Sequence, residues 1–181
     1  MASLSKELRN LRQAVLTAHA DVRENILSLR TTLAHETGLV SAVMEYLDEF
    51  GIQTGIEVDF NNKVGDELAL SSIAEVQLVC ILQEALTNVR KHSSANHVNV
   101  QIAREENELR EFVKLTVIDN GSGFNLNESK RSFGLQTMRE RAHSVHGEIT
   151  ILSQPGKGTR VELILPCQDQ EAFKKTSLVL S

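Results

Sequence analysis

Segments of two different periodicities follow one another between residues 56 and 165, and their order limits the fold more than any other feature of the sequence. Apolar residues that alternate with polar ones predict strands, whereas apolar residues spaced by three and four predict helices. The predicted strands are 56–60, 98–102, 112–118, 148–153 and 159–165, and the predicted helices are 72–92 and 133–146. Because strands and helices do not strictly alternate, we expect an α+β fold with helices on one face of a mixed sheet.

The residues before this region predict helices instead. Apolar residues from Leu4 to Leu33 recur at steps of four and three, close to a heptad seam. Such a helix needs a partner helix, from a second chain or from a segment outside this sequence, unless it packs on its own domain. A second helix is predicted from Leu39 to Gly51. The predicted parts are a helical segment (1–51), a main domain (52–168) and a C-terminal tail (169–181).

Composition excludes several classes of partner. The formal net charge is −5 and aromatic residues make up 4%, so neither a broad positive field nor base-stacking platforms for nucleic acid are expected. Cys80 and Cys167 lie far apart in the sequence, which predicts neither a disulfide framework nor a zinc site. No run of apolar residues is long enough to span a membrane. We therefore expect a soluble, cytoplasmic piece.

A row of polar side chains marks the end of the predicted helix 72–92. Glu84, Asn88, Lys91 and His92 stand at i, i+4, i+7 and i+8, so they share one helix face. The amide oxygen of Asn88 suits a hard cation such as Mg²⁺, and the two basic side chains suit phosphate oxygens. Taken alone, this row is more typical of a solvated helix face.

The predicted strand 112–118 leads into a second polar group. Asp119 has the same parity as Val117, so its carboxylate continues an apolar face and needs a hydrogen-bond donor. A nucleobase amino group is one candidate donor, and a backbone turn is the other. Gly121 and Gly123 would let the backbone approach a flat ligand closely.

Two further glycine segments are weaker signals. Gly134 and Leu135 open the predicted helix 133–146, where free N–H groups and the helix dipole favour a phosphate. Gly158 and Thr159 belong to a turn before the last strand. Each is typical of an ordinary cap or hairpin, and neither forms a Walker loop or a dinucleotide-binding glycine pattern.

Together and in this order, the four segments resemble the catalytic, ATP-binding domain of sensor histidine kinases. QEALTNVRKHS is similar to the asparagine box of that family, VIDNGSGF and FGLQTMRERA to its two glycine boxes, and PGKGTRVELILP to its glycine-threonine box. The sequences of these motifs are most similar to those of the subfamily whose response regulators are of the nitrate-regulator type. The resemblance implies a Bergerat-type two-layer α/β sandwich after a long N-terminal helix, with ATP and Mg²⁺ as cofactors.

The resemblance also implies roles for single residues. Asn88 would ligate Mg²⁺, Glu84 would orient or polarise the attacking group, and Asp119 would accept a hydrogen bond from the adenine amino group. A mobile lid is implied over residues 125–133. Contacts to the nucleotide are implied for Lys91, His92, Gly121, Gly123, Gly134, Leu135, Gly158 and Thr159.

In that family the γ-phosphoryl group of ATP passes to a histidine and then to an aspartate of a response regulator. Neither His19 nor His35 has the family's acceptor context, so we expect a piece that begins after the acceptor and binds ATP or ADP. The parent protein would be a homodimer through the N-terminal helices. Two alternatives remain open, namely a serine kinase of the anti-sigma-factor type and a non-catalytic nucleotide-sensing or dimerisation module.

Overall fold

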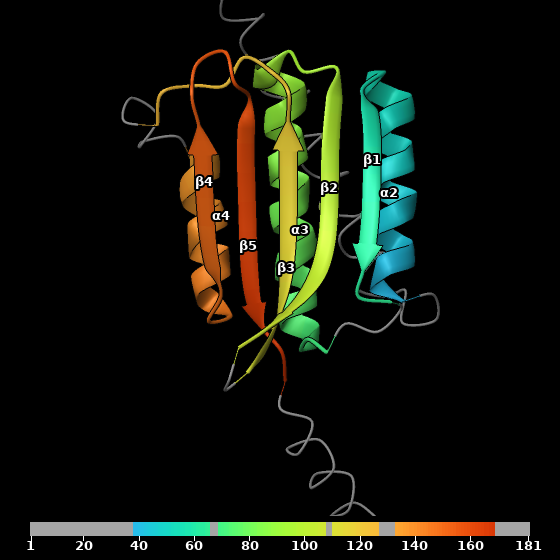
Figure 1. The fold of residues 1–181 in the computed structure, drawn as a ribbon, viewed down its shortest axis with the longest axis vertical. Coiled ribbons are helices and arrows are strands. Elements are labelled where there is room, and N and C mark those ends of the chain that lie inside the picture. The colour runs from blue at the N-terminus through green and yellow to red at the C-terminus, as the bar shows by residue number, and fades with distance from the viewer. Residues whose placement is uncertain (1–37, 66–68, 108–109, 127–132, 169–181) are drawn as a thin grey trace, which may run out of the picture.

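The computed structural model describes residues 38–65, 69–107, 110–126 and 133–168. The helix predicted over 4–33 and the tail 169–181 lie outside the described residues, as does most of the predicted lid. The elements follow the chain (Figure 1) as α2 (Leu39–Thr54), β1 (Glu57–Lys63), α3 (Ser72–Asn88), η1 (Val89–Ser93), β2 (His97–Glu106), β3 (Glu111–Asp119), α4 (Phe133–Ser144), β4 (Glu148–Ser153) and β5 (Thr159–Pro166).

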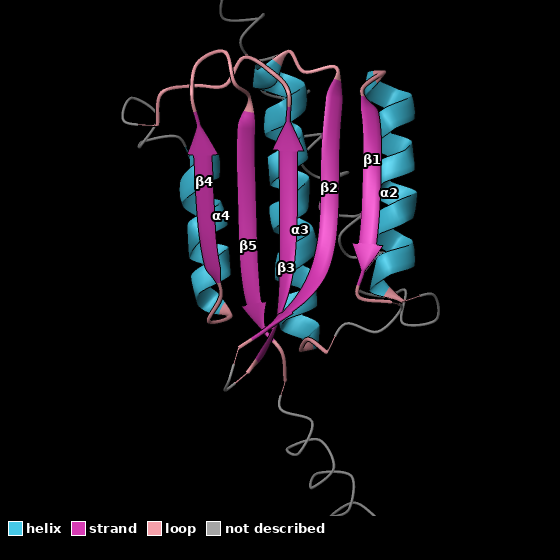
Figure 2. Cartoon of the chain, in the orientation of Figure 1, coloured by secondary structure: helices cyan, strands magenta, loops and turns pink. Residues whose placement is uncertain are grey.

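The strands form one mixed sheet in the order β1-β2-β3-β5-β4. The pair β1–β2 is parallel, with α3 in the connection between the two strands, and the other three pairs are antiparallel. Figure 2 shows α2, α3 and α4 on the same face of this sheet. This two-layer arrangement confirms the predicted α+β fold.

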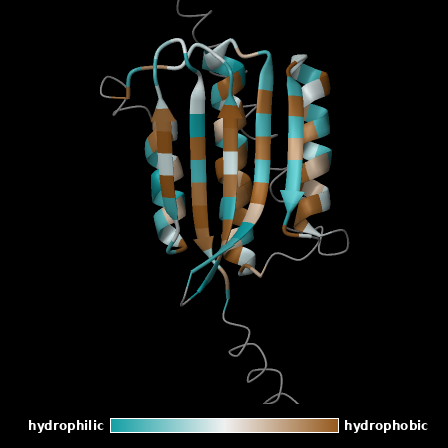
Figure 3. Cartoon of the chain, viewed as in Figure 1, coloured by the Kyte–Doolittle hydropathy of each residue, from teal (hydrophilic) through white to brown (hydrophobic). Residues whose placement is uncertain are grey.

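The core lies between the sheet and the helices. Apolar side chains alternate with polar ones along the strands, as Figure 3 shows by colour, and the apolar set faces the helices. On α3, Leu78, Leu82 and Leu86 recur at four-residue steps and are fully buried. The buried face of α2 belongs to the same cluster through Val43 and Leu47.

Two helix ends differ from their prediction. The prediction that α2 ends at Gly51 was wrong, because the helix continues through this glycine to Thr54 and Gly55 caps it in a left-handed conformation. The predicted boundary between residues 51 and 52 therefore falls inside α2, and the division into parts stays a prediction. The run Ser72-Ile73-Ala74-Glu75 has the form of a capping box and predicts Ser72 as the N-cap of α3. The N-cap is instead Ser71, whose hydroxyl oxygen accepts from the Ala74 N–H.

The C-terminal ends of α3 and α4 also depart from the simple expectation. The α-helical part of α3 ends at Asn88 rather than near His92, and the chain widens into the π-helical turn η1. The helix predicted to end at residue 146 ends at Ser144, and His146 takes a left-handed conformation after it. The Gly147 N–H bonds to the Ala142 carbonyl, which is the six-to-one bond of a Schellman motif.

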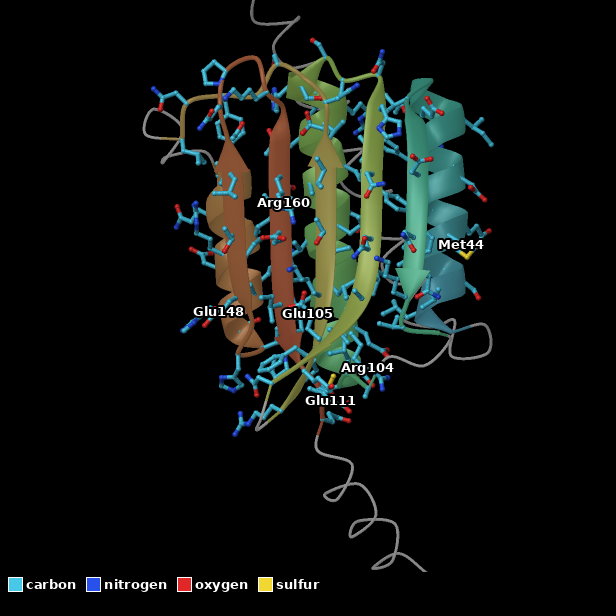
Figure 4. All side chains as sticks on the ribbon, in the orientation of Figure 1. Met44, Arg104, Glu105, Glu111, Glu148 and Arg160 are labelled. Carbon is cyan, nitrogen blue, oxygen red and sulfur yellow. The ribbon has the colours of Figure 1, made fainter. Side chains whose placement is uncertain are left out.

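The other face of the sheet has no helix over it among the described residues (Figure 4). It carries ion pairs that cross the strands, including Lys114 Nζ to Glu105 at 3.0 Å and to Glu162 at 3.5 Å. The hydrogen bond from Arg160 is the main reason that the pKa of Glu162 is lowered. Within the described ranges, no helix has the length and apolar character needed to cross a bilayer.

Candidate active site

A cavity of about 600 Å³ opens where β3 ends and β5 begins, between these strands and the helical elements α3, η1 and α4. In Figure 1 this is the upper end of the sheet, where α3 ends and α4 begins. Nine of the predicted site residues line it together, although they come from segments far apart in the sequence. These are Glu84, Asn88, Lys91, His92, Asp119, Gly123, Gly134, Leu135 and Thr159.

One wall is made by the end of α3 and by η1. Glu84 and Asn88 stand on α3, and Lys91 and His92 follow on η1, where both are exposed at the mouth of the cavity. The prediction that these four residues share a face is confirmed, although the last two are carried by a π-helical turn. A carboxylate and an amide therefore lie deeper than two basic groups.

Asn88 is the member of this wall with a polar atom left unpaired. Its Nδ2 is buried and has no hydrogen-bond partner among the described residues. Such an atom is costly to leave unsatisfied, so it marks a position where a ligand acceptor would stabilise the structure. Gly134 keeps this region open, because a Cβ there would overlap Glu84 Oε1 and would lie 3.7 Å from Asn88 Nδ2.

The donor set fits a magnesium ion that is only partly held by protein. Among the described residues, no group of three or more His, Cys, Asp or Glu side chains could hold a metal ion. Mg²⁺ keeps several waters and commonly takes one or two protein oxygens together with substrate phosphates. The amide oxygen of Asn88, one turn after Glu84 on α3, could supply such an oxygen.

Asp119 supplies a buried carboxylate on the strand side of the cavity, with 4% of its surface exposed. Its Oδ1 accepts from the Gly121 N–H at 2.8 Å, and Thr159 donates to the same carboxyl group through its hydroxyl and its backbone N–H. The backbone-turn donor considered from the sequence is therefore present. Burial nonetheless raises the pKa of Asp119 above its ordinary value, and these hydrogen bonds only partly oppose that effect.

The raised pKa predicts how stability depends on pH. The folded chain binds a proton at Asp119 more readily than the unfolded chain does, so this group makes the free energy of unfolding fall as pH rises through the interval between 3.8 and the raised pKa. The unfavourable effect is complete above that interval and absent below it. Urea unfolding of the wild type and of Asp119→Asn, from about pH 3 to about pH 7, should show the wild type losing stability relative to the variant. A stability difference that stays constant or moves the other way would contradict this expectation.

Gly121 and Gly158 lie behind the wall of the cavity rather than on it. A Cβ on Gly121 would overlap the Ser93 carbonyl oxygen and would come within 2.8 Å of Asp119 Oδ1. Gly158 is buried with φ +70°, and a Cβ there would overlap the Asp119 carbonyl oxygen. These two glycines let the chain segments around Asp119 approach one another.

The sequence analysis missed the apolar part of the cavity. Val117 and Val161 lie on neighbouring strands with the parity of Asp119 and Thr159, so strand periodicity could have identified them. Met138 could have been found at helical spacing from Gly134 and Leu135. The other lining residues that were missed are Ala85, Thr87, Val89, Ser93, Phe124 and Phe133.

Comparison with known families assigns this architecture. The family model described as histidine kinase-, DNA gyrase B-, and HSP90-like ATPase matches residues 73–169, which include every predicted site residue. The chain belongs to this ATPase family. The predicted family resemblance is thereby confirmed, whereas pairing with a nitrate-regulator-type partner stays a prediction.

Curated relatives in this ATPase family are sensor histidine kinases. The chain is 36% identical to the signal transduction histidine-protein kinase/phosphatase DegS of Brevibacillus brevis, over 92% of this chain and 42% of that protein. It is 35% identical to the sensor histidine kinase LiaS of Bacillus subtilis, over 92% of this chain and 44% of that protein. The chain thus spans less than half the length of these relatives.

Solved structures agree at the level of the fold. The blue-light activated histidine kinase of Erythrobacter litoralis EL346 is similar with a TM-score of 0.63 and 18% identity, over 83% of this chain and 48% of that one. The histidine kinase domain of the same protein gives a TM-score of 0.58 and 19% identity, over 75% of this chain and 64% of that one.

Proposed function

We propose that this chain is the ATP-binding catalytic part of a two-component sensor histidine kinase. The observation that carries the proposal is the cavity itself, which combines a buried carboxylate from β3 with an amide, a carboxylate and two basic groups from α3 and η1. A purine amino group would donate to Asp119. Phosphate oxygens would meet Lys91 and His92, and the N-terminus of α4, at Gly134 and Leu135, would bind another phosphate through its positive dipole end.

The chemistry follows from holding the substrate in place. Asn88 would hold Mg²⁺ through its amide oxygen, and that ion would neutralise charge on the phosphates when bound. Glu84 would orient the attacking nitrogen of the acceptor histidine, and Lys91 and His92 would stabilise the negative charge of the transferring group. Phosphoryl transfer depends mainly on positioning and on such electrostatic stabilisation.

The acceptor histidine and the partners are part of the proposal as well. The acceptor would come from a helix outside this sequence, and the parent protein would be a homodimer through its N-terminal helices. A response regulator would receive the phosphoryl group, and the motif sequences suggest one of the nitrate-regulator type. We place this catalytic part in the cytoplasm, with a membrane reached only through other segments of the parent protein.

Calorimetric titration with ADP and ATP, with and without Mg²⁺, tests the proposal. We expect micromolar to millimolar dissociation constants, or about 4 to 8 kcal/mol of binding free energy, and tighter binding with the metal. No binding at millimolar nucleotide would contradict the proposal and favour the non-catalytic module. If the chain binds nucleotide but its parent phosphorylates a serine, the anti-sigma-factor type of kinase becomes the better assignment.

Replacing Asn88 with alanine should separate metal from nucleotide binding. Because Asn88→Ala removes the proposed magnesium ligand, the gain in ADP affinity on adding Mg²⁺ should fall about tenfold, while metal-free ADP affinity changes less. Asn61→Ala, at an exposed position of β1, is the matched control and should behave as wild type. An unchanged magnesium dependence in Asn88→Ala would remove Asn88 from the metal site.

A further inference from the structure

The hydroxyl group of Ser153, the last residue of β4, joins three segments around the cavity without lining it. Its oxygen accepts from the Phe124 N–H at 2.9 Å, it donates to the Gly158 carbonyl oxygen at 2.9 Å, and it lies 3.1 Å from Thr159 Oγ1. Phe124 and Thr159 both belong to the cavity wall. A single side chain behind the wall therefore ties the segment after β3 to the start of β5.

The backbone around Ser153 brings the same segments together. Ser153 pairs with Thr159 across the β4–β5 ladder, and the Gly156 N–H donates to the Ser122 carbonyl at 2.6 Å. Paired residues of an antiparallel ladder project from the same face, so both hydroxyl groups face the helix side, where Asp119 lies. Ser153 thus contacts Thr159, and Thr159 contacts the buried carboxylate.

A count of hydroxyl protons shows what Ser153 adds. Thr159 has one hydroxyl proton, which can point to Asp119 or to Ser153. The one hydroxyl proton of Ser153 is donated to the Gly158 carbonyl oxygen, so in the contact between the two hydroxyl groups Thr159 is the donor. When the Thr159 proton points to Ser153 in this way, the Asp119 carboxylate has more capacity for another donor. Among the contacts that the structure describes, loss of the Ser153 hydroxyl would leave Asp119 as the only side-chain partner of the Thr159 hydroxyl.

We propose that Ser153 is a positioning residue for adenine recognition, which holds Thr159 and the Phe124 segment so that the Asp119 carboxylate can accept from the 6-amino group of the purine. This inference rests on the proposed nucleotide-binding function. Ser153 acts through Thr159 and Phe124 and does not itself touch the base.

Calorimetry on the full chain with two nucleotides tests this role. ADP carries the 6-amino donor, whereas inosine diphosphate has an oxygen at that position. Ser153→Ala should weaken ADP binding about tenfold, the loss expected for one net hydrogen bond of the site, and should change inosine diphosphate binding much less. Ser153→Thr keeps a hydroxyl group and should keep the preference for ADP. Thr150→Ala, an exposed position on the same strand, should match the wild type.

The ratio of the two affinities separates positioning from a purely structural role. Equal fold losses of ADP and inosine diphosphate affinity, which leave the ratio of the two affinities unchanged, would overturn the inference. If Ser153→Ala fails to fold, Ser153→Cys offers a weaker donor of similar size, and the same fall in the ratio is expected. Failure of the wild type to bind ADP would count against the proposed function, whereas wild-type binding with an unchanged ratio in the variants would overturn the role of Ser153 alone.

Discussion

Asp119→Asn is expected to weaken ADP binding by about 100-fold or more while leaving the chain folded. The Gly121 N–H requires an acceptor, so the side-chain oxygen of the asparagine would take that position and its amide nitrogen would face the cavity. The amino group of the base would then face an N–H donor where the wild type presents a carboxylate oxygen. The variant loses a buried charge but offers one acceptor oxygen fewer to the Thr159 donors, so its free energy of unfolding at neutral pH should change little.

The matched control for this variant is Asp59→Asn. Asp59 is an exposed carboxylate on β1 that pairs with His97 on the uncovered face of the sheet, so the change in net charge is the same. ADP affinity measured by calorimetry should not change in the control. Retention of wild-type affinity in Asp119→Asn would remove Asp119 from the proposed base contact.

Gly158→Ala is expected to cause the largest loss of stability, about 3 kcal/mol or more. Its backbone has φ +70°, and the added Cβ would overlap the Asp119 carbonyl oxygen and lie 3.2 Å from the Gly121 nitrogen. The substituted chain must move β5 away from β3 or change the backbone conformation. Either response would displace Asp119, so ADP affinity should fall together with stability.

Gly156→Ala isolates the backbone part of this effect. Gly156 has φ +79° in the same turn, but a Cβ there would have no atom within 4 Å. The control should therefore lose only about 1 to 2 kcal/mol, the usual effect of placing alanine in the left-handed region. Free energies of unfolding from urea titration would measure both variants, and equal losses would show that the close approach to Asp119 has no energetic effect.

Local periodicity was sufficient to predict the layers and much of the site. Strand parity placed Asp119 on the same face as Val117, and both are buried on the helix side of β3. Helical spacing placed Glu84 and Asn88 on one face, and both line the cavity. These predictions succeed because a period of two or 3.6 residues fixes side-chain direction within one element.

What the sequence did not reveal depends on contacts between distant segments. Ser153 and Phe124 are far apart along the chain, and no local pattern indicates their hydrogen bond. Two glycines, Gly51 and Gly55, could each have ended α2. Only Gly55 takes the left-handed conformation that caps a helix, whereas Gly51 packs near the Ile56 carbonyl. The parallel pairing of β1 with β2 likewise follows from the crossover through α3 and not from either strand alone.

The π-helical turn η1 limits which changes in length this part of the chain can tolerate. A π-helical turn holds more residues than an α-helical turn. In η1, the Ser93 carbonyl oxygen accepts from the Ser122 N–H at 2.6 Å, and Lys91 and His92 lie at the cavity mouth. Deleting one residue within η1 would restore a regular helix but rotate all later side chains by about 100°. Substitutions in η1 should therefore be accepted far more readily than insertions or deletions, and natural length variation among related chains is expected at the surface turns instead.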